Sequence, residues 1–244
     1  FGLQIRERDQ YELKAADMGT VMHEALEKFS KKLQENGETW KTVTDDTRDR
    51  LIEECVEEMM ADYGNTIFQS SSRNQYRIIR VKRILKRTVW ALQQQIRQGE
   101  FEPGEFEVSF SMEDSLSAIN IDLSEHEKMR LRGRIDRVDL CETDDKVYVK
   151  IIDYKTGNTS LDLVALYYGL QLQLAVYLDA AMELEQKKHP GKQVEPAGVF
   201  YYHIDDPMLD QEEDETDEAW GRRMLKALRM DGLVNADRKV VELL

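Results

Sequence analysis

An acid and a lysine stand two residues apart at the end of an apolar run. The stretch IIDYKTG, residues 151–157, carries Asp153 and Lys155, and a second stretch, GRIDRVD at 133–139, carries Asp136. Carboxylates hold Mg²⁺ or Mn²⁺, and a lysine can steady an attacking hydroxide, so these residue types fit metal-dependent hydrolysis of a phosphodiester. An acid-x-lysine tripeptide is weak by itself, because it arises by chance in chains of this length.

The acids belong to two apolar stretches that predict a β-hairpin. KMRLRGRIDRVDLC and KVYVKIIDYKTG flank the polar turn ETDD. A tight turn there pairs Val138 with Ile151 and Asp136 with Asp153, unless a bulge near Arg137 shifts the register. Two like charges directly opposite one another destabilise a bare sheet, so we expect a cation between them.

Asp139 follows Asp136 in the same motif but has a different expected role. Side chains alternate between the faces of a strand, so Asp139 points away from the face of Asp136. Arg134 and Arg137 lie close enough in sequence to pair with it. We therefore expect Asp139 to be structural.

Hydrophobic spacing predicts the elements that must position these residues. Period-3.6 patterns predict helices, and alternating or continuous apolar runs predict strands. The expected helices cover residues 16–33, 44–62, 72–98 and 161–186, and the expected strands cover 101–110, 128–141, 146–157 and 194–204. The last segment reads as a helix, a turn at DGL and a short end element. The fold class is mixed α/β, with a small central mixed β-sheet flanked by helices on both faces.

The charge distribution matters more than the total. The formal net charge of −14 argues against general adhesion to nucleic acid, because phosphate binding rests mainly on Lys and Arg. In the expected helix over 72–98, an apolar arc is formed by Ile78, Val81, Leu85, Val89, Leu92 and Ile96. The opposite side gathers Arg73, Arg77, Arg80, Arg83 and Arg87. This face is either simply solvated or a contact for the DNA backbone, which its single sign of charge favours.

Composition limits the class of protein. Two cysteines, Cys55 and Cys141, argue against a disulfide scaffold, and helical spacing makes Cys55 a buried core thiol. The sequence shows no run of about 18 apolar residues and no leader, so we expect a soluble cytoplasmic protein without a membrane partner. Because the first residue is Phe1, we expect a piece of a longer protein.

Taken together, these motifs resemble the PD-(D/E)XK nucleases of the RecB type, and within them the nuclease domain of the B subunit of bacterial AddAB helicase-nucleases. The resemblance runs from FGLQIRERDQYELKAADMGTVMHEALEKF through GRIDRVD, IIDYKTG and QLQLAVYL to DGLVNADRKVV. It implies a single nuclease domain over 1–244. The expected parts are a helical part at 1–100, a catalytic core at 101–204, an acidic loop at 205–218 and a C-terminal helix and end segment at 219–244.

The resemblance also implies a role for each motif residue. Its metal ligands are His23, Asp136, Asp153 and the backbone carbonyl of Tyr154. Lys155 becomes the catalytic lysine, and Gln173 and Tyr177 match a Q-x-x-x-Y motif that orients the lysine or touches DNA. Without the resemblance, His23 would be a boundary histidine, and Gln173 and Tyr177 would be packing residues.

Cofactors and partners follow from the same resemblance. We expect Mg²⁺ to support activity and Mn²⁺ to bind more tightly, because an imidazole ligand suits softer metals. The family's 4Fe-4S cluster is held by cysteines that neither Cys55 nor Cys141 matches, so we expect the cluster only in a longer parent. No GxxxxGK[ST] motif for binding ATP is present in the sequence, so we expect this chain to have no helicase motor of its own. The resemblance implies that a longer parent supplies helicase-like domains and that an AddA-type subunit is its partner. The domain would cut the 5′-ended strand as DNA is unwound.

Two alternatives remain at this point. The first is a non-catalytic scaffold that binds DNA ends or a helicase partner. The second is another exonuclease of the same fold, either CRISPR-associated or of the phage-recombination type. The complete set of His23, Asp136, Asp153 and Lys155 favours a catalyst over a scaffold.

Overall fold

The computed structural model describes residues 15–62, 72–110, 119–122, 128–131, 133–210 and 215–244. The chain divides into two compact units. One unit comprises Phe1–Glu38 and Val43–Val89, and the other comprises Thr39–Thr42 and Trp90–Leu244. The organisation as a single domain stays a prediction.

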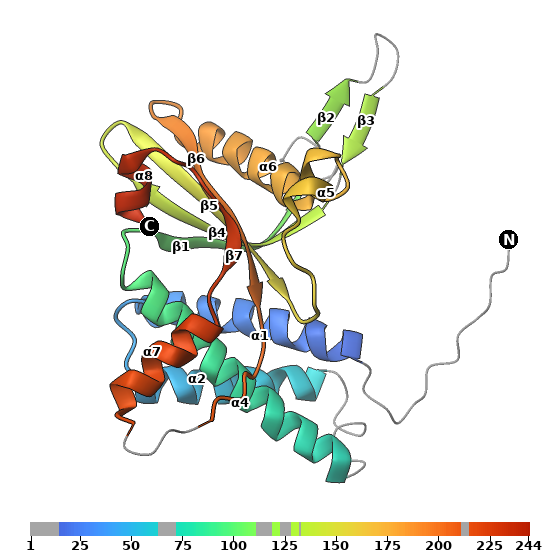
Figure 1. Cartoon of the computed structure of the whole chain (residues 1–244), viewed down its shortest axis with the longest axis vertical. Coiled ribbons are helices and arrows are strands. Elements are labelled where there is room, and N and C mark those ends of the chain that lie inside the picture. The colour runs from blue at the N-terminus through green and yellow to red at the C-terminus, as the bar shows by residue number, and fades with distance from the viewer. Residues whose placement is uncertain (1–14, 63–71, 111–118, 123–127, 132, 211–214) are drawn as a thin grey trace, which may run out of the picture. The chain divides into compact units, whose positions relative to one another are not determined.

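The first unit is helical, as the apolar spacing predicted. It contains α1 (Ala15–Glu35), α2 (Asp45–Asp62) and the residues of α4 (Ser72–Ile96) up to Val89 (Figure 1). Each helix buries one apolar stripe. The buried side chains include Val21, Ala25, Leu26, Phe29 and Leu33 of α1, Leu51, Ile52, Cys55, Val56 and Met59 of α2, and Val81, Ile84, Leu85 and Val89 of α4.

The second unit is built on a five-stranded sheet with strand order β1-β4-β5-β6-β7. Its strands are β1 (Glu102–Phe110), β4 (Gly133–Glu142), β5 (Lys146–Lys155), β6 (Gln193–His203) and β7 (Asp231–Val234). The strands β5 and β6 run parallel and the other neighbours run antiparallel, so the expected mixed sheet is confirmed. The central strand β5 is buried along most of its length, which explains its continuous apolar run.

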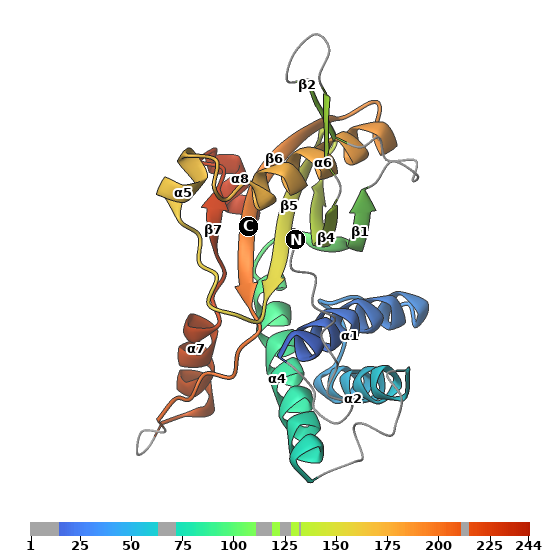
Figure 2. The same cartoon turned by 90° about the vertical axis from the view of Figure 1, so that its right-hand side faces the viewer.

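Helices cover both faces of this sheet. On one face, α6 (Gln173–Lys188) packs through Leu174, Ala180 and Ala181 against a core that includes Val138, Val149 and Ile151 (Figure 2). On the other face, α8 (Arg238–Leu243) brings Val240 to a core with Phe101, Cys141, Tyr148 and Ala197. A third helix, α7 (Asp217–Ala227), packs through Met224 with Ala91 and Leu228. The α/β class is therefore confirmed.

Three element boundaries differ from the sequence prediction. The strand expected over 128–141 is two strands, because β3 (Lys128–Leu131) pairs with β2 (Ile119–Asp122) in a separate ribbon. The helix expected over 161–186 is also divided, into α5 (Leu163–Tyr167) and α6, with Gly169 at φ 73° between them. The DGL turn is wrong as well, because Asp231–Val234 forms β7 on the edge of β6.

Two expectations from composition can be compared with the structure. Both cysteines are buried, which confirms Cys55 as a core thiol. Burial raises the pKa of the Cys55 thiol to about 11, so it stays protonated. Among the described residues, every helix is too short or too polar to cross a bilayer.

Candidate active site

The hairpin of β4 and β5 brings Asp136 to the end of β5. The predicted register is confirmed by the Val138–Ile151 pair, and the ladder ends at Arg137–Ile152, one pair before Asp136 and Asp153 would meet. Beyond the last backbone pair, the Asp136 side chain connects the two strands, because its Oδ2 accepts a hydrogen bond of 2.7 Å from the backbone N–H of Tyr154. This contact fixes the carboxylate beside the strand end.

Four side chains form a connected polar network at the end of β5. Asp153 is only 2% exposed, and its carboxylate pairs with the ammonium of Lys155. Gln173 bridges the two, because its Nε2 donates to Asp153 Oδ1 and its Oε1 accepts from Lys155 Nζ, both at 3.1 Å. Gln173 Nε2 also donates to the Tyr177 hydroxyl at 3.0 Å. Lys155 thus supplies a cation to Asp153, and a cation between Asp136 and Asp153 stays a prediction.

The first turn of α6 positions this network. Gln173 is the first residue of α6, and an i,i+4 spacing puts Tyr177 on the same helix face. On β6, the ring of Tyr201 lies 5.1 Å from Lys155 Nζ and offers its face to the ammonium. Burial raises the pKa of the Tyr201 hydroxyl, so the ring stays neutral. Helix and strand therefore hold Lys155 from two sides.

Glu107 on β1 joins Asp136, and the sequence reading did not identify it. Its carboxylate and that of Asp136 offer oxygens within 4.8 Å of each other. Glu107 has φ 53°, a left-handed conformation that is uncommon outside glycine, and its side chain is only 5% exposed and pairs with Arg134. The alternation of apolar and polar residues in FEVSF indicates that Glu107 lies on a strand. The pairing of that strand with β4 could not be read from the sequence, because a long segment separates the two strands.

On the opposite face of the hairpin, a buried ion cluster holds the two strands together. Arg137 binds Asp139 with two hydrogen bonds of 2.5 and 2.8 Å, and Lys150 Nζ lies 3.1 Å from the same carboxylate. Arg137 and Asp139 are fully buried, and the guanidinium stacks 5.1 Å from the ring of Trp40. Although burial alone raises the pKa of Asp139, the charges of Arg137 and Lys150 lower it below its usual value. The predicted structural role of Asp139 is confirmed.

The remaining predicted residues belong to the first unit. His23 is half-buried on α1, and its place in the metal site stays a prediction. On α4, Arg80 and Arg83 are exposed and Arg77 and Arg87 are half-buried, whereas the side chain of Arg73 lies outside the described residues. The lysines of the same stretch have acidic partners that the sequence did not reveal. Lys82 pairs with Glu57 and Lys86 with Glu53, both on α2.

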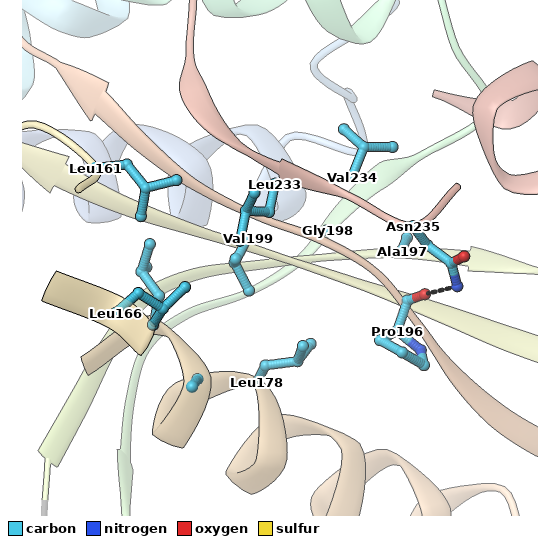
Figure 3. A pocket seen from close by; sticks show the side chains of 12 residues that line it. Leu161, Leu166, Leu178, Pro196, Ala197, Gly198, Val199, Leu233, Val234 and Asn235 are labelled. Atoms are coloured by element: carbon cyan, nitrogen blue, oxygen red, sulfur yellow. Dashed lines mark hydrogen bonds between the residues drawn. The ribbon is translucent and has the colours of Figure 1, made fainter. Parts of the chain in front are cut away.

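An apolar hollow of about 350 Å³ lies against α6 and is lined in part by Leu174, the residue after Gln173 (Figure 3). It is lined by residues of α5, α6, β6 and β7, among them Leu166, Leu178 and Leu233. Its polar lining residue, Asn235, donates a hydrogen bond of 2.9 Å to Pro196 O. The hollow suits an apolar group, so the chemistry is assigned to the hairpin and α6.

Comparisons with known proteins agree with this geometry. A family model described as PD-(D/E)XK nuclease superfamily matches residues 1–241. The B subunit of the ATP-dependent helicase/deoxyribonuclease of Lachnoclostridium phytofermentans is 48% identical over 100% of this chain and 20% of its own length. The protein of the same name from Alkaliphilus metalliredigens is 41% identical over 99% of this chain and 21% of its own length.

The chain therefore spans about a fifth of the length of the curated relatives that it matches. The resemblance that the motifs indicated is confirmed, since these relatives are helicase/deoxyribonuclease B subunits. With a family model that covers nearly all its residues and a strand end that carries Asp153 and Lys155, the chain belongs to the PD-(D/E)XK nuclease superfamily.

Proposed function

We propose that this domain hydrolyses DNA phosphodiester bonds in a reaction that depends on Mg²⁺ or Mn²⁺, acting on single strands as an exonuclease. The observation that carries the proposal is the network of Asp153, Lys155, Gln173 and Tyr177 beside Asp136. It combines carboxylates for a metal with a held ammonium for developing negative charge. A scaffold has no need for such a network.

The donor atoms present fit a hard divalent cation. Asp136 and Glu107 offer carboxylate oxygens within 4.8 Å of each other, and oxygen donors suit Mg²⁺ and Mn²⁺. We assign the metal to Asp136, Asp153 and the backbone carbonyl of Tyr154, with His23 as the nitrogen ligand and Glu107 as a further carboxylate. The bound metal would polarise the scissile phosphate and lower the pKa of a water molecule.

The other residues of the site act on charge and position. Lys155 places its ammonium where negative charge develops on the phosphate or on the attacking hydroxide. Gln173 holds Lys155 and Asp153 at fixed separation through hydrogen bonds of 3.1 Å to each. Tyr177 lies on the same face of α6 and accepts a hydrogen bond from Gln173. Together, the two residues either orient the lysine or contact the DNA.

The first test is metal dependence. Chelation is expected to abolish degradation of end-labelled single-stranded DNA, and Mg²⁺ or Mn²⁺ to restore it, because the proposed ligands are all on this chain. Calorimetry is expected to show tighter binding for Mn²⁺ than for Mg²⁺. Cleavage that continues at full rate after exhaustive chelation would exclude the proposed chemistry.

Calorimetry also tests the assignment of Glu107. Glu107→Gln is expected to weaken Mn²⁺ binding about tenfold or more, because it removes a charged oxygen ligand. Glu105→Gln is the matched control, since Glu105 lies on the same strand and pairs with Lys188 instead. Equal Mn²⁺ affinity in the two variants would remove Glu107 from the site.

The arginine face of α4 is the proposed contact for the DNA backbone. Replacing Arg77, Arg80 and Arg87 by Glu is expected to make the slope of log K against log salt shallower by about 2, at about 0.7 per lost phosphate contact on a single strand. Arg80→Glu alone is compared with Arg50→Glu, an exposed arginine of α2 that pairs with Glu54. If the salt dependence is unchanged in the triple variant, α4 does not bind the backbone.

The names of the relatives suggest the wider setting. Because they are B subunits of ATP-dependent helicase/deoxyribonucleases, we propose that this domain serves a bacterial, cytoplasmic helicase-nuclease with an AddA-type partner in repair of broken DNA. In that setting it cuts the 5′-ended strand, and a 4Fe-4S cluster belongs to the longer parent. Co-purification of a full-length parent with its partner subunit, and strand-specific end labels, test these assignments.

A further inference from the structure

The segment between β5 and α6 presents an apolar surface to solvent. We call residues 161–172 the tyrosine loop; it contains α5, none of whose residues is buried. The rings of Tyr167 and Tyr168 are 84% and 71% exposed. Its other exposed large apolar side chains are Leu163, Val164, Leu170 and Leu172. Single exposed apolar residues are ordinary, but a contiguous group marks a binding surface.

Hydrogen bonds at both ends of this loop hold its backbone in shape. Asp162 Oδ1 caps α5 by accepting from the backbone N–H groups of Val164 and Ala165 at 2.8 and 3.1 Å. Gln171 ties the two ends together, since its Oε1 accepts from Asp162 N and its Nε2 donates to Ser160 O, both at 2.9 Å. The rings are therefore displayed on an ordered backbone, which lowers the entropy cost of binding.

The two rings are arranged so that a flat partner can reach them. Their centroids lie 5.3 Å apart and their planes are nearly perpendicular, at 85°. An edge-to-face pair of this kind leaves the broad face of at least one ring open. Together with the high exposure of both rings, this geometry favours stacking by an aromatic ligand.

The loop also lies next to the proposed active site. It connects the end of β5 at Lys155 to Gln173, which bonds both Lys155 and Asp153. Tyr168 precedes Gln173 by five residues, a length that spans at most about 18 Å when fully extended. A strand in the site thus passes within a few nucleotides of these rings.

The charge around the loop decides which part of a nucleic acid fits it. Residues 156–186 contain no Lys or Arg, and they include Asp162, Asp179, Glu183 and Glu185. Phosphate contacts depend on cations, so the DNA backbone is a poor match for this surface. A nucleobase has an uncharged aromatic face, and base stacking on tyrosine needs no cation.

We propose that Tyr167 and Tyr168 form a stacking platform for unpaired bases of the strand on which the site acts. The proposal rests on the proposed nuclease function. Bases in a duplex are already stacked on one another, so the platform binds single strands and not duplexes. It contacts the strand independently of the phosphate contacts assigned to α4.

The test compares ring removal with ring retention. A Tyr167→Ala, Tyr168→Ala double variant is expected to bind a fluorescein-labelled single-stranded oligonucleotide about tenfold or more weakly than wild type, without divalent metal so that no cutting occurs. The Tyr167→Phe, Tyr168→Phe variant keeps both rings and is expected to bind like wild type. Leu170→Ala, which removes exposed apolar area without a ring, is the matched control on the same loop.

An abasic oligonucleotide supplies the second arm of the experiment. The double alanine variant and wild type are expected to bind it equally, because no base remains to stack, and to bind duplex DNA equally. Unchanged affinity for the normal strand, or an equal loss on the abasic strand, would overturn the platform and assign the surface to a protein partner. Failure of wild type to cut with Mg²⁺ or Mn²⁺ would instead overturn the proposed nuclease function, which the metal-free binding data do not test.

Discussion

Lys155→Ala is expected to lower the rate of single-strand cleavage by about a hundredfold to a thousandfold, the range seen when one preorganised donor to developing charge is removed. The ammonium of Lys155 is held by Asp153, Gln173 and the face of Tyr201, so its removal takes away a fixed positive charge at the end of β5. Asp153→Ala is expected to lose at least as much, because it removes a proposed metal ligand and the partner of the lysine. Single-turnover degradation of end-labelled DNA with saturating Mg²⁺ measures the effect on the chemical step.

Two controls separate chemistry from folding. Lys187→Ala removes a lysine of α6 that pairs with the half-exposed Glu183, and it is expected to leave the rate unchanged. Circular dichroism checks that the variants fold, and calorimetry is expected to show that Lys155→Ala still binds Mn²⁺ whereas Asp153→Ala does not. A folded Lys155→Ala protein that cuts at the rate of wild type would show that this lysine is not catalytic.

The second large effect is expected on stability, from the buried cluster behind the hairpin. Asp139→Asn leaves Arg137 and Lys150 buried near an uncharged amide, and breaking a buried pair in this way typically costs about 3–5 kcal/mol. Urea unfolding followed by circular dichroism measures the loss. Glu183→Gln breaks an exposed pair on α6 and is expected to change stability by less than about 1 kcal/mol.

The pH dependence of this cluster has a definite sign. The neighbouring cations lower the pKa of Asp139 in the folded protein, so its contribution to stability is present above the ordinary aspartate pKa of about 3.9 and is lost as the pH falls below it. The stability difference between wild type and Asp139→Asn is therefore expected to shrink on acidification. A difference that is constant from pH 7 to pH 3 would contradict the role given to this carboxylate.

The hairpin and its chemistry could be predicted because local rules agree there. A polar turn between two apolar stretches sets the register, and the alternation of faces separates Asp136 from Asp139. Gln173 and Tyr177 could be placed on one helix face because their spacing alone requires it.

The misses arise where tertiary pairing decides the structure. The apolar spacing of residues 161–186 continues through Gly169, so periodicity could not reveal the break between α5 and α6. The strand β7 is short and contains Gly232, and pairing with β6 is what makes it a strand. Glu107 was missed because its partner strand follows after a long segment, whose length gives no register.

The side-chain amide of Gln173 both donates and accepts hydrogen bonds, and this fixes the order of the charged groups along the proposed site. An amide has a donor end and an acceptor end that cannot exchange roles, and here the oxygen faces Lys155 while the nitrogen faces Asp153 and Tyr177. The glutamine is therefore held in one orientation, because a reversed amide would turn its NH₂ group toward the ammonium of Lys155 and its oxygen toward the carboxylate of Asp153. Because the Tyr177 hydroxyl accepts a hydrogen bond from the same amide nitrogen, Tyr177 helps to keep the amide in this orientation.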